Sequence, residues 1–243
     1  MTSGLQPLSA QAPPLAPPVV ASQVWRDVAF LHWRVAAQQV AGLLPPGVVP
    51  DEHDGGTWVG LIGFELDRAT IGPTPPIPYF GRFAEINVRL YAVDAVGRRG
   101  VVFRSLEASR LAAVLAARAA FSIPYEWSST SIQRGQSTVA FGARRHIGRG
   151  RTSFGVTWER EAAEAGELEL FLTARWGLFT ERFGRTIYLP NEHEEWRLHP
   201  ATLTGLDDEL VRLAGVAVGG PPDSVLFSPG VTARFGRAQP VPR

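Results

Sequence analysis

The chain of 243 residues is 45% hydrophobic and 19% charged, and at this length folding buries on the order of three quarters of the unfolded surface. A net charge of +1 gives no overall field that would attract nucleic acid or an anionic membrane. The absence of cysteine excludes disulfides and cysteine nucleophiles, and the absence of lysine, all 24 Lys and Arg residues being arginines, excludes Schiff-base chemistry.

The first 22 residues are rich in proline and small residues and carry no charged side chain, so we predict a flexible leader over 1–22. We see no internal repeat and no linker after it, which predicts a single domain over 23–243. The chain lacks a signal-peptide pattern and any run of about 18 apolar residues. We therefore expect a cytoplasmic protein with no membrane association.

The first predicted elements are a strand, a short helix and a second strand. The first strand covers 28–33, and apolar residues at helical spacing predict a helix over 36–44, which the prolines and glycine at 45–47 end. The second strand covers 57–64, and its glycines indicate close backbone approach or curvature. A proline-rich loop around 73–78 follows.

The next predicted strand, 83–91, alternates between two very different faces. One face carries the apolar residues Ile86, Val88 and Leu90. The other carries Glu85, Asn87, Arg89 and Tyr91. Such a polar face is either a solvated surface or the lining of a pocket, and the local pattern does not separate the two.

The rest of the chain is dominated by short strands. A turn at 97–100 joins 83–91 to a strand over 101–106 in a hairpin, and an alanine-rich helix covers 108–121. Further strands are predicted over 137–141, 152–158, 168–176, 186–189 and 225–228, with a short helix over 206–213. This succession indicates an antiparallel barrel or sandwich with helices at its periphery.

Several short motifs carry a resemblance to a known family. They are the sequences at 30–33, 43–47, 85–89, 105–108, 117–118, 123–125 and 173–176, with His193 and Trp196. In these the chain resembles the YqjF-like family of uncharacterised conserved proteins, which has an acetoacetate decarboxylase-like fold. The resemblance implies an α+β, mainly β, fold: an antiparallel acetoacetate decarboxylase-like β-barrel with a few peripheral helices.

The resemblance to the decarboxylases implies roles for individual positions. Arg26 resembles their catalytic arginine, by its spacing to Trp33-Arg34 and Leu43-Leu44-Pro45, and Glu85 resembles a glutamate of the barrel. A second decarboxylase glutamate has no counterpart. The frame set by Arg118 and Pro124 places the decarboxylase lysine pair at Tyr125 and Glu126. Without a lysine, decarboxylation through an imine is excluded.

Our first hypothesis is therefore a small-molecule site in the barrel for an acidic or keto-acid-like ligand. Its candidate catalytic residues are Glu85 and Tyr125, and its candidate ligand-binding residues are Arg26, Asn87, Arg89, Arg118 and Glu126. An enzyme of this kind would be a lysine-independent lyase or hydrolase acting on a small carboxylate or keto acid. The alternative is a noncatalytic structural or ligand-sensing protein whose polar barrel residues form an ion-pair network.

Other polar residues favour less specific roles. His32, His193 and His199 have no metal-ligand spacing, so we expect no metal and no cofactor. The basic cluster at 144–151 is typical of a charged hairpin tip, and we do not expect nucleic acid as a partner. The sequence leaves the oligomeric state open, a homo-oligomer included.

Overall fold

The computed structural model describes residues 4–242, so residues 1–3 of the expected leader and residue 243 lie outside it. The strands are β1 (Ala21–Val35), β2 (Val48–Pro50), β3 (Thr57–Ile71), β4 (Phe83–Asp94), β5 (Arg99–Ala108), β6 (Tyr125–Arg134), β7 (Thr138–Arg145), β8 (Arg151–Trp158), β9 (Gly177–Arg182), β10 (Arg185–Glu192), β11 (His199–Asp208), β12 (Ser224–Phe235) and β13 (Gln239–Pro240). The helices are α1 (Ala37–Ala41), α2 (Leu111–Phe121), α3 (Glu167–Thr173) and α4 (Leu210–Leu213).

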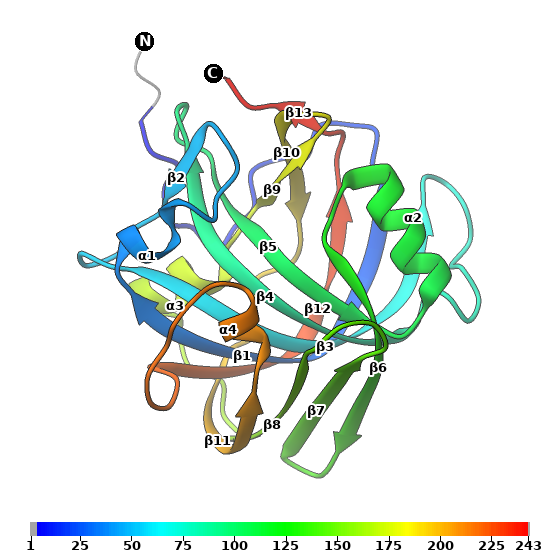
Figure 1. The fold of residues 1–243 in the computed structure, drawn as a ribbon, viewed down its shortest axis with the longest axis vertical. Helices are drawn as coiled ribbons and strands as arrows, with labels where there is room; N and C mark the ends of the chain where they lie inside the picture. The colour runs from blue at the N-terminus through cyan, green and yellow to red at the C-terminus, as the bar shows by residue number, and fades with distance from the viewer. Residues whose placement is uncertain (1–3, 243) are drawn as a thin grey trace.

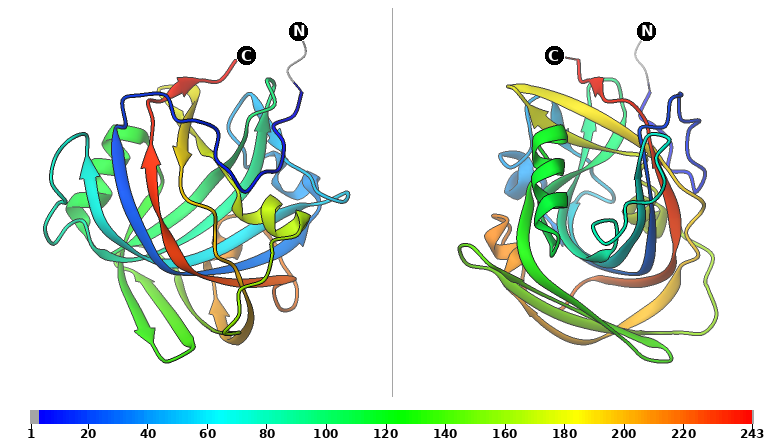
Figure 2. Two further views of the ribbon diagram at one scale, coloured as in Figure 1. Left: turned by 180° about the vertical axis from the view of Figure 1, so that it is seen from behind. Right: turned by 90° about the vertical axis from the view of Figure 1, so that its right-hand side faces the viewer.

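The strands close into two rings that share a central sheet. One ring runs β5-β6-β7-β8-β11-β12-β1-β3-β4 and returns to β5, which makes a closed nine-stranded barrel. The second ring runs along the same β12-β1-β3-β4-β5 strands and is closed by β9 and β10. In Figure 1 these shared strands cross the middle of the molecule, with β7 and β8 below them and β9 and β10 above. Helix α2 lies outside the strands (Figure 2). The predicted barrel with peripheral helices is confirmed.

Both faces of the shared strands are buried, because one face lines the interior of the nine-stranded barrel and the other lines the interior of the second ring. On β4, Ile86, Val88 and Leu90 are fully buried in the largest apolar cluster, together with residues of β7 and β8. The alternate residues Glu85 and Asn87 are equally inaccessible, but they face the interior enclosed by β9 and β10. The polar face of this strand is therefore not a solvated surface: Glu85, Asn87 and Arg89 line a pocket, and Tyr91 is fully buried.

A β-bulge in β1 decides which of its residues face that interior. The pairing with β3 shifts register between Arg26 and Ala29, and Asp27 adopts a left-handed conformation with φ of 52°. Before the bulge Trp25 faces the pocket, and after it Val28 does so. The bulge thus reverses the alternation and leaves Arg26 on the outer surface.

One predicted strand is wrong. Most of 168–176 is helix α3, and β9 begins only after it. Phe171 and Leu172 are buried on one side of this helix, and the carboxylates of Glu167 and Glu169 lie in its first turn, where they interact favourably with the helix dipole. The apolar run is short enough to fit either element, and tertiary packing selects the helix.

Several other segments differ from the predicted elements, among them the helix over 206–213 and the segment of strand β6. The predicted helix 206–213 is reduced to α4, because 206–208 continue β11 in its pairing with β8. Strand β6 was not predicted, since its residues 128–134 are mostly polar. It runs parallel to β5 at its start and then pairs with β7.

Residues near the N-terminus contact the barrel. The side chain of Gln6 accepts a hydrogen bond from the backbone of Arg99 at 3.0 Å, and the backbone of Leu15 donates to Glu192 at 3.2 Å. Flexibility over 1–22 and the single domain over 23–243 stay predictions. Within residues 4–242 no helix is long and apolar enough to cross a membrane.

Candidate functional site

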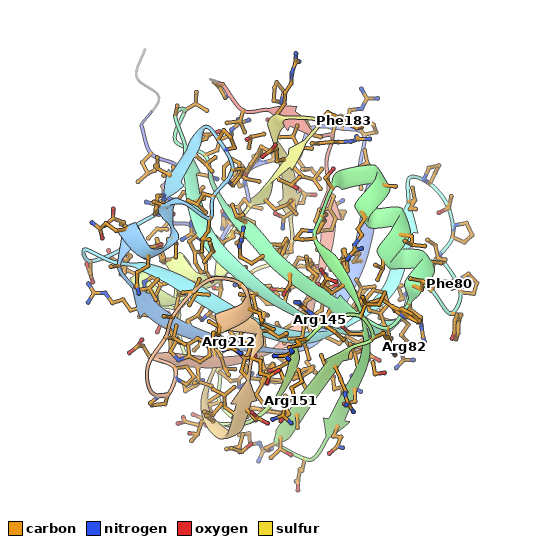
Figure 3. The ribbon with its side chains drawn as sticks, in the orientation of Figure 1. Phe80, Arg82, Arg145, Arg151, Phe183 and Arg212 are labelled. Atoms are coloured by element: carbon orange, nitrogen blue, oxygen red, sulfur yellow. The ribbon has the colours of Figure 1, made fainter. Side chains whose placement is uncertain are left out.

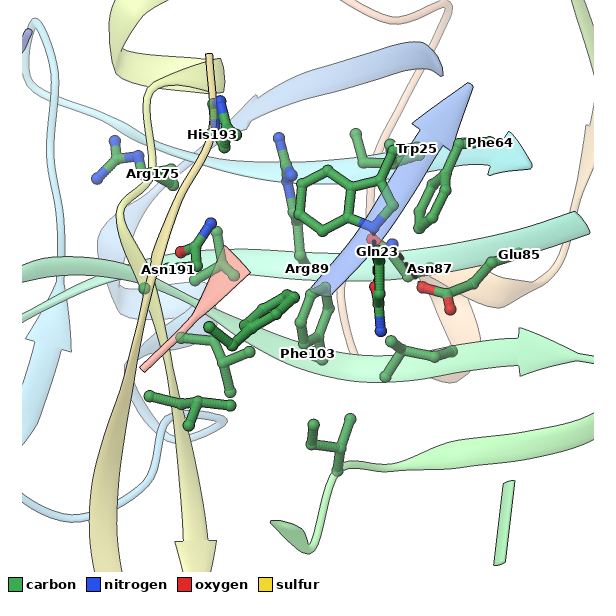
Figure 4. A pocket seen from close by; sticks show the side chains of 18 of the residues that line it. Gln23, Trp25, Phe64, Glu85, Asn87, Arg89, Phe103, Arg175, Asn191 and His193 are labelled. Carbon is green, nitrogen blue, oxygen red and sulfur yellow. Dashed lines mark hydrogen bonds between the residues drawn. The ribbon is translucent and has the colours of Figure 1, made fainter. Parts of the chain in front are cut away.

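A cavity of about 170 Å³ lies inside the ring closed by β9 and β10. For comparison, an engineered apolar cavity of about 150 Å³ binds benzene. In the present protein, most of the cavity wall is aromatic or aliphatic. Its polar residues are Gln23, Glu85, Asn87, Arg89, Tyr125, Thr173, Arg175, Asn191 and His193. Figure 4 shows Glu85 and Asn87 on one side of the cavity and Arg175 and His193 on the other, with Arg89 between them.

The first polar end is a carboxyl–phenol pair. The Tyr125 hydroxyl donates a 2.8 Å hydrogen bond to Glu85, and the Asn87 amide donates a longer one of 3.5 Å. Burial raises the pKa of Glu85 to about 7, although both hydrogen bonds act to lower it. Burial and the nearby Glu85 charge raise the pKa of Tyr125 well above its ordinary value. Near neutral pH some molecules therefore carry a protonated Glu85 and others an ionised Glu85. Tyr125 keeps its proton and acts as a hydrogen-bond donor.

The second polar end is built around Arg89. Its guanidinium donates to the Tyr91 hydroxyl at 3.1 Å and to the backbone carbonyl of Leu172 at 2.9 Å, and it lies 5.7 Å from the centre of the Phe30 ring. Among the described residues it forms no ion pair with a carboxylate. Arg89 is thus a half-buried positive charge, fixed by neutral partners, on the wall of a mostly apolar cavity.

Arg175 adds to the positive charge at this end. It pairs with Asp51 at 2.5 Å, but Asp51 also pairs with Arg99 at 2.9 Å, so one carboxylate serves two guanidinium groups. The Nη2 atom of Arg175 is buried and has no hydrogen-bond partner among residues 4–242. Because uncompensated buried charges and donors are costly, this end of the cavity is suited to an anion.

His193 completes this end in an aromatic setting. Its ring lies 4.5 Å from that of Trp176 and 4.8 Å from that of Trp196, and its Nδ1–H donates to the Glu194 carbonyl at 2.6 Å. Burial lowers the pKa of His193 to about 4. The imidazole is therefore neutral near pH 7, with Nε2 free to accept a hydrogen bond.

The structure brings together only some of the predicted site residues. Glu85, Asn87, Arg89 and Tyr125 all line the cavity. Arg26 does not, because it pairs on the outer surface with Asp67 at 3.1 Å. The other two lie outside the cavity as well: Arg118 and Glu126 pair with each other at 3.1 Å, and both are partly exposed.

Sequence reasoning missed Arg175, and it did not place His193 in the cavity. Arg175 follows α3, in a segment predicted as a strand, and His193 follows β10. The motif at 173–176 that supports the family resemblance contains Arg175, and this was the available signal. Neither local pattern shows that the two residues meet β4 in space.

The other residues considered for metal or phosphate binding have structural contacts. His32 is fully buried against the Tyr91 hydroxyl at 2.6 Å, and His199 contacts the Glu159 carbonyl at 2.9 Å. The described part of the chain contains no group of three potential metal ligands. Residues 144–151 form the β7–β8 hairpin tip as predicted, and Arg145 (Figure 3) turns inward to the buried Glu107 at 2.7 Å.

The closed barrel with an interior cavity is the acetoacetate decarboxylase-like fold. An acetoacetate decarboxylase-like enzyme from Sphingomonas wittichii RW1 superposes with a TM-score of 0.65 at 14% identity, over 93% of this chain and 94% of that one. The enduracididine biosynthesis enzyme MppR, in complex with pyruvate, superposes with a TM-score of 0.63 at 14% identity, over 93% and 91% of the chains. At these identities the similarity defines the fold alone.

Sequence comparison defines the family. Residues 22–232 match the DUF2071 family, described as an uncharacterized conserved protein, and the chain belongs to this family. It is 29% identical over 183 residues to the uncharacterized protein YqjF of Bacillus subtilis (strain 168), which covers 74% of this chain and 75% of YqjF. The predicted YqjF-like membership is confirmed.

Proposed function

We propose that the cavity binds a small, elongated carboxylic acid of keto-acid type, with its carboxylate at Arg89 and its carbonyl group at Glu85 and Tyr125. The observation that carries this proposal is the charge of Arg89, which has no carboxylate partner among residues 4–242 and lies on the cavity wall. A guanidinium binds a carboxylate through charge-assisted hydrogen bonds.

The distance between the two polar ends sets the shape of the ligand. Glu85 and Arg89 are four residues apart on β4, which separates their Cα atoms by about 13 Å. The Arg89 guanidinium also turns toward Tyr91, farther from Glu85. A ligand that reaches both ends therefore needs several carbon atoms between its carboxylate and its carbonyl. The apolar walls between the ends, including Phe30 and Phe103, fit such a carbon chain.

Two further observations support a keto-acid-type ligand. The structural relative MppR has been solved in complex with pyruvate, a keto acid. The chain has no lysine, so a bound carbonyl meets the Tyr125 hydroxyl and the Glu85 carboxyl instead of an amine. We propose that recognition of the carbonyl is noncovalent.

The alternative of a purely structural ion-pair network receives less support. Mutual pairing of Arg26, Arg118 and Glu85 inside the cavity would favour that hypothesis. Arg26 and Arg118 instead form ion pairs outside the cavity, and Glu85 is hydrogen-bonded to neutral partners. A noncatalytic ligand-sensing role stays compatible with the cavity.

Calorimetric titration with a ladder of acids tests the proposal. The ladder contains pyruvate, 4-oxopentanoate, 5-oxohexanoate and 7-oxooctanoate, with the matched methyl esters as uncharged controls. We expect the acids with separated carboxylate and carbonyl groups to bind more tightly than pyruvate, and the esters to bind at least tenfold more weakly than their acids.

Two variants locate the carboxylate. Arg89→Met should weaken binding of the acids about tenfold or more, since a charge-assisted hydrogen bond is lost. Arg26→Met removes an arginine of the outer surface and should leave the affinity unchanged. Failure of every acid to bind, or equal affinity in wild type and Arg89→Met, would refute the proposal.

A further inference from the structure

Building on the proposed function, we infer that the Glu85–Tyr125 pair catalyses enolisation of the bound ligand, by moving a proton at the carbon next to its carbonyl group. Glu85 is the catalytic base and Tyr125 is the donor that stabilises the oxygen of the enolate. The inference rests on the position of the two groups: both line the cavity, and they lie 2.8 Å apart.

The reaction balances without any further reactant. The Glu85 carboxylate accepts the proton from the carbon, so a C–H bond breaks and an O–H bond forms. The electron pair of the C–H bond becomes the new C=C bond, and the carbonyl π electrons move onto oxygen. Tyr125 donates its hydrogen bond to that oxygen. Return of a proton from Glu85 to carbon restores the ketone, and exchange of this proton with solvent makes the step observable.

The surroundings of the pair suit this chemistry. The cavity wall near it carries Ile62, Phe64, Leu106 and Ile123, which keep the carboxyl in an apolar setting. In such a setting a hydrogen bond to a developing oxyanion is worth more than in water. Since the chain has no lysine, the enolate needs this direct hydrogen bond in place of an imine. A carboxylate base combined with hydrogen-bond donors that include a tyrosine is an established arrangement for proton transfer next to a carbonyl.

The hydrogen bond between the two groups also provides a way to activate the base. In the structure Tyr125 donates to Glu85, and this contact lowers the pKa of Glu85. A carbonyl oxygen that takes over the Tyr125 hydrogen bond leaves Glu85, among the described residues, with the long 3.5 Å contact to Asn87 as its side-chain hydrogen bond. Glu85 then becomes a stronger base at the moment when the carbonyl becomes more acidic at its neighbouring carbon.

Deuterium exchange measured by proton NMR tests the inference. The whole protein is incubated in D₂O with 5-oxohexanoate, and the signals of the hydrogens next to the ketone are followed against buffer alone. General acid–base catalysis contributes about 100- to 10,000-fold, so Glu85→Gln should lower the exchange rate about 100-fold or more. Tyr125→Phe should lower it at least tenfold. Glu161→Gln, on an exposed loop, is the matched control and should exchange at the wild-type rate.

Titration of each variant with the same acid separates the outcomes. If Glu85→Gln and Tyr125→Phe still bind 5-oxohexanoate, the variants are folded. Loss of accelerated exchange in these folded variants supports the catalytic roles. Binding by wild type without exchange above buffer overturns this inference and leaves the proposed function standing. Exchange at the wild-type rate in Glu85→Gln or in Tyr125→Phe also overturns it. Absence of binding by wild type refutes the proposed function, and the inference falls with it.

Discussion

Glu85 should make the protein less stable as the pH rises, and Glu85→Gln should remove this effect. The side chain is 2% exposed, and burial raises its pKa from the ordinary value of 4.5 to about 7. A carboxyl whose pKa is higher in the folded state binds more protons there, so its contribution to stability is complete below pH 4.5 and is lost as the pH rises through 7. At about 1.4 kcal/mol for each pKa unit, the loss between pH 5 and pH 8 is about 2.5 kcal/mol.

The assay is urea unfolding of wild type and Glu85→Gln at pH 5 and pH 8. The change in unfolding free energy between the two pH values is compared between the two proteins. The difference is needed because His193 acts in the opposite direction: its pKa is lowered to about 4, so its contribution is gained as the pH rises from 4 toward 6.5. We expect wild type to lose about 2.5 kcal/mol relative to Glu85→Gln between the two pH values. The exposed control Glu161→Gln should follow wild type. A relative change below about 0.5 kcal/mol would show that Glu85 is not desolvated as described.

Two further substitutions test the support of the site. Asp51→Asn removes the shared buried counter-ion of Arg99 and Arg175 and should cost about 3 to 5 kcal/mol of unfolding free energy, measured by urea unfolding, with a smaller loss contradicting a buried ion pair. Gly60→Ala places a methyl group 3.0 Å from the His32 ring and should lower the unfolding free energy by about 1 to 3 kcal/mol. A thermal melt should therefore show a lower melting temperature. An unchanged melting temperature would show that the ring has room to move.

The sequence determined the class of fold because barrel strands leave strong local signals. The alternation at 83–91, the glycine and proline punctuation and the alanine-rich helix each depend on near neighbours in the chain. The prediction of a strand over 168–176 was wrong because a short apolar run fits a strand or a helix equally well. Burial of Phe171 and Leu172 decides between the two. Strand β6 was not predicted because its polar residues give no local strand signal.

The candidate site divides in the same way. The sequence by itself determined that no lysine or cysteine takes part, and that Glu85, Asn87 and Arg89 share one face of a strand. Only the tertiary structure decided that this face lines a cavity, because that depends on β9 and β10 closing a ring over it. The structure also turned Arg26 outward through a one-residue bulge and brought Arg175 to the cavity from a distant segment. Side-chain direction and long-range closure depend on the register and path of the whole chain, which no local pattern contains.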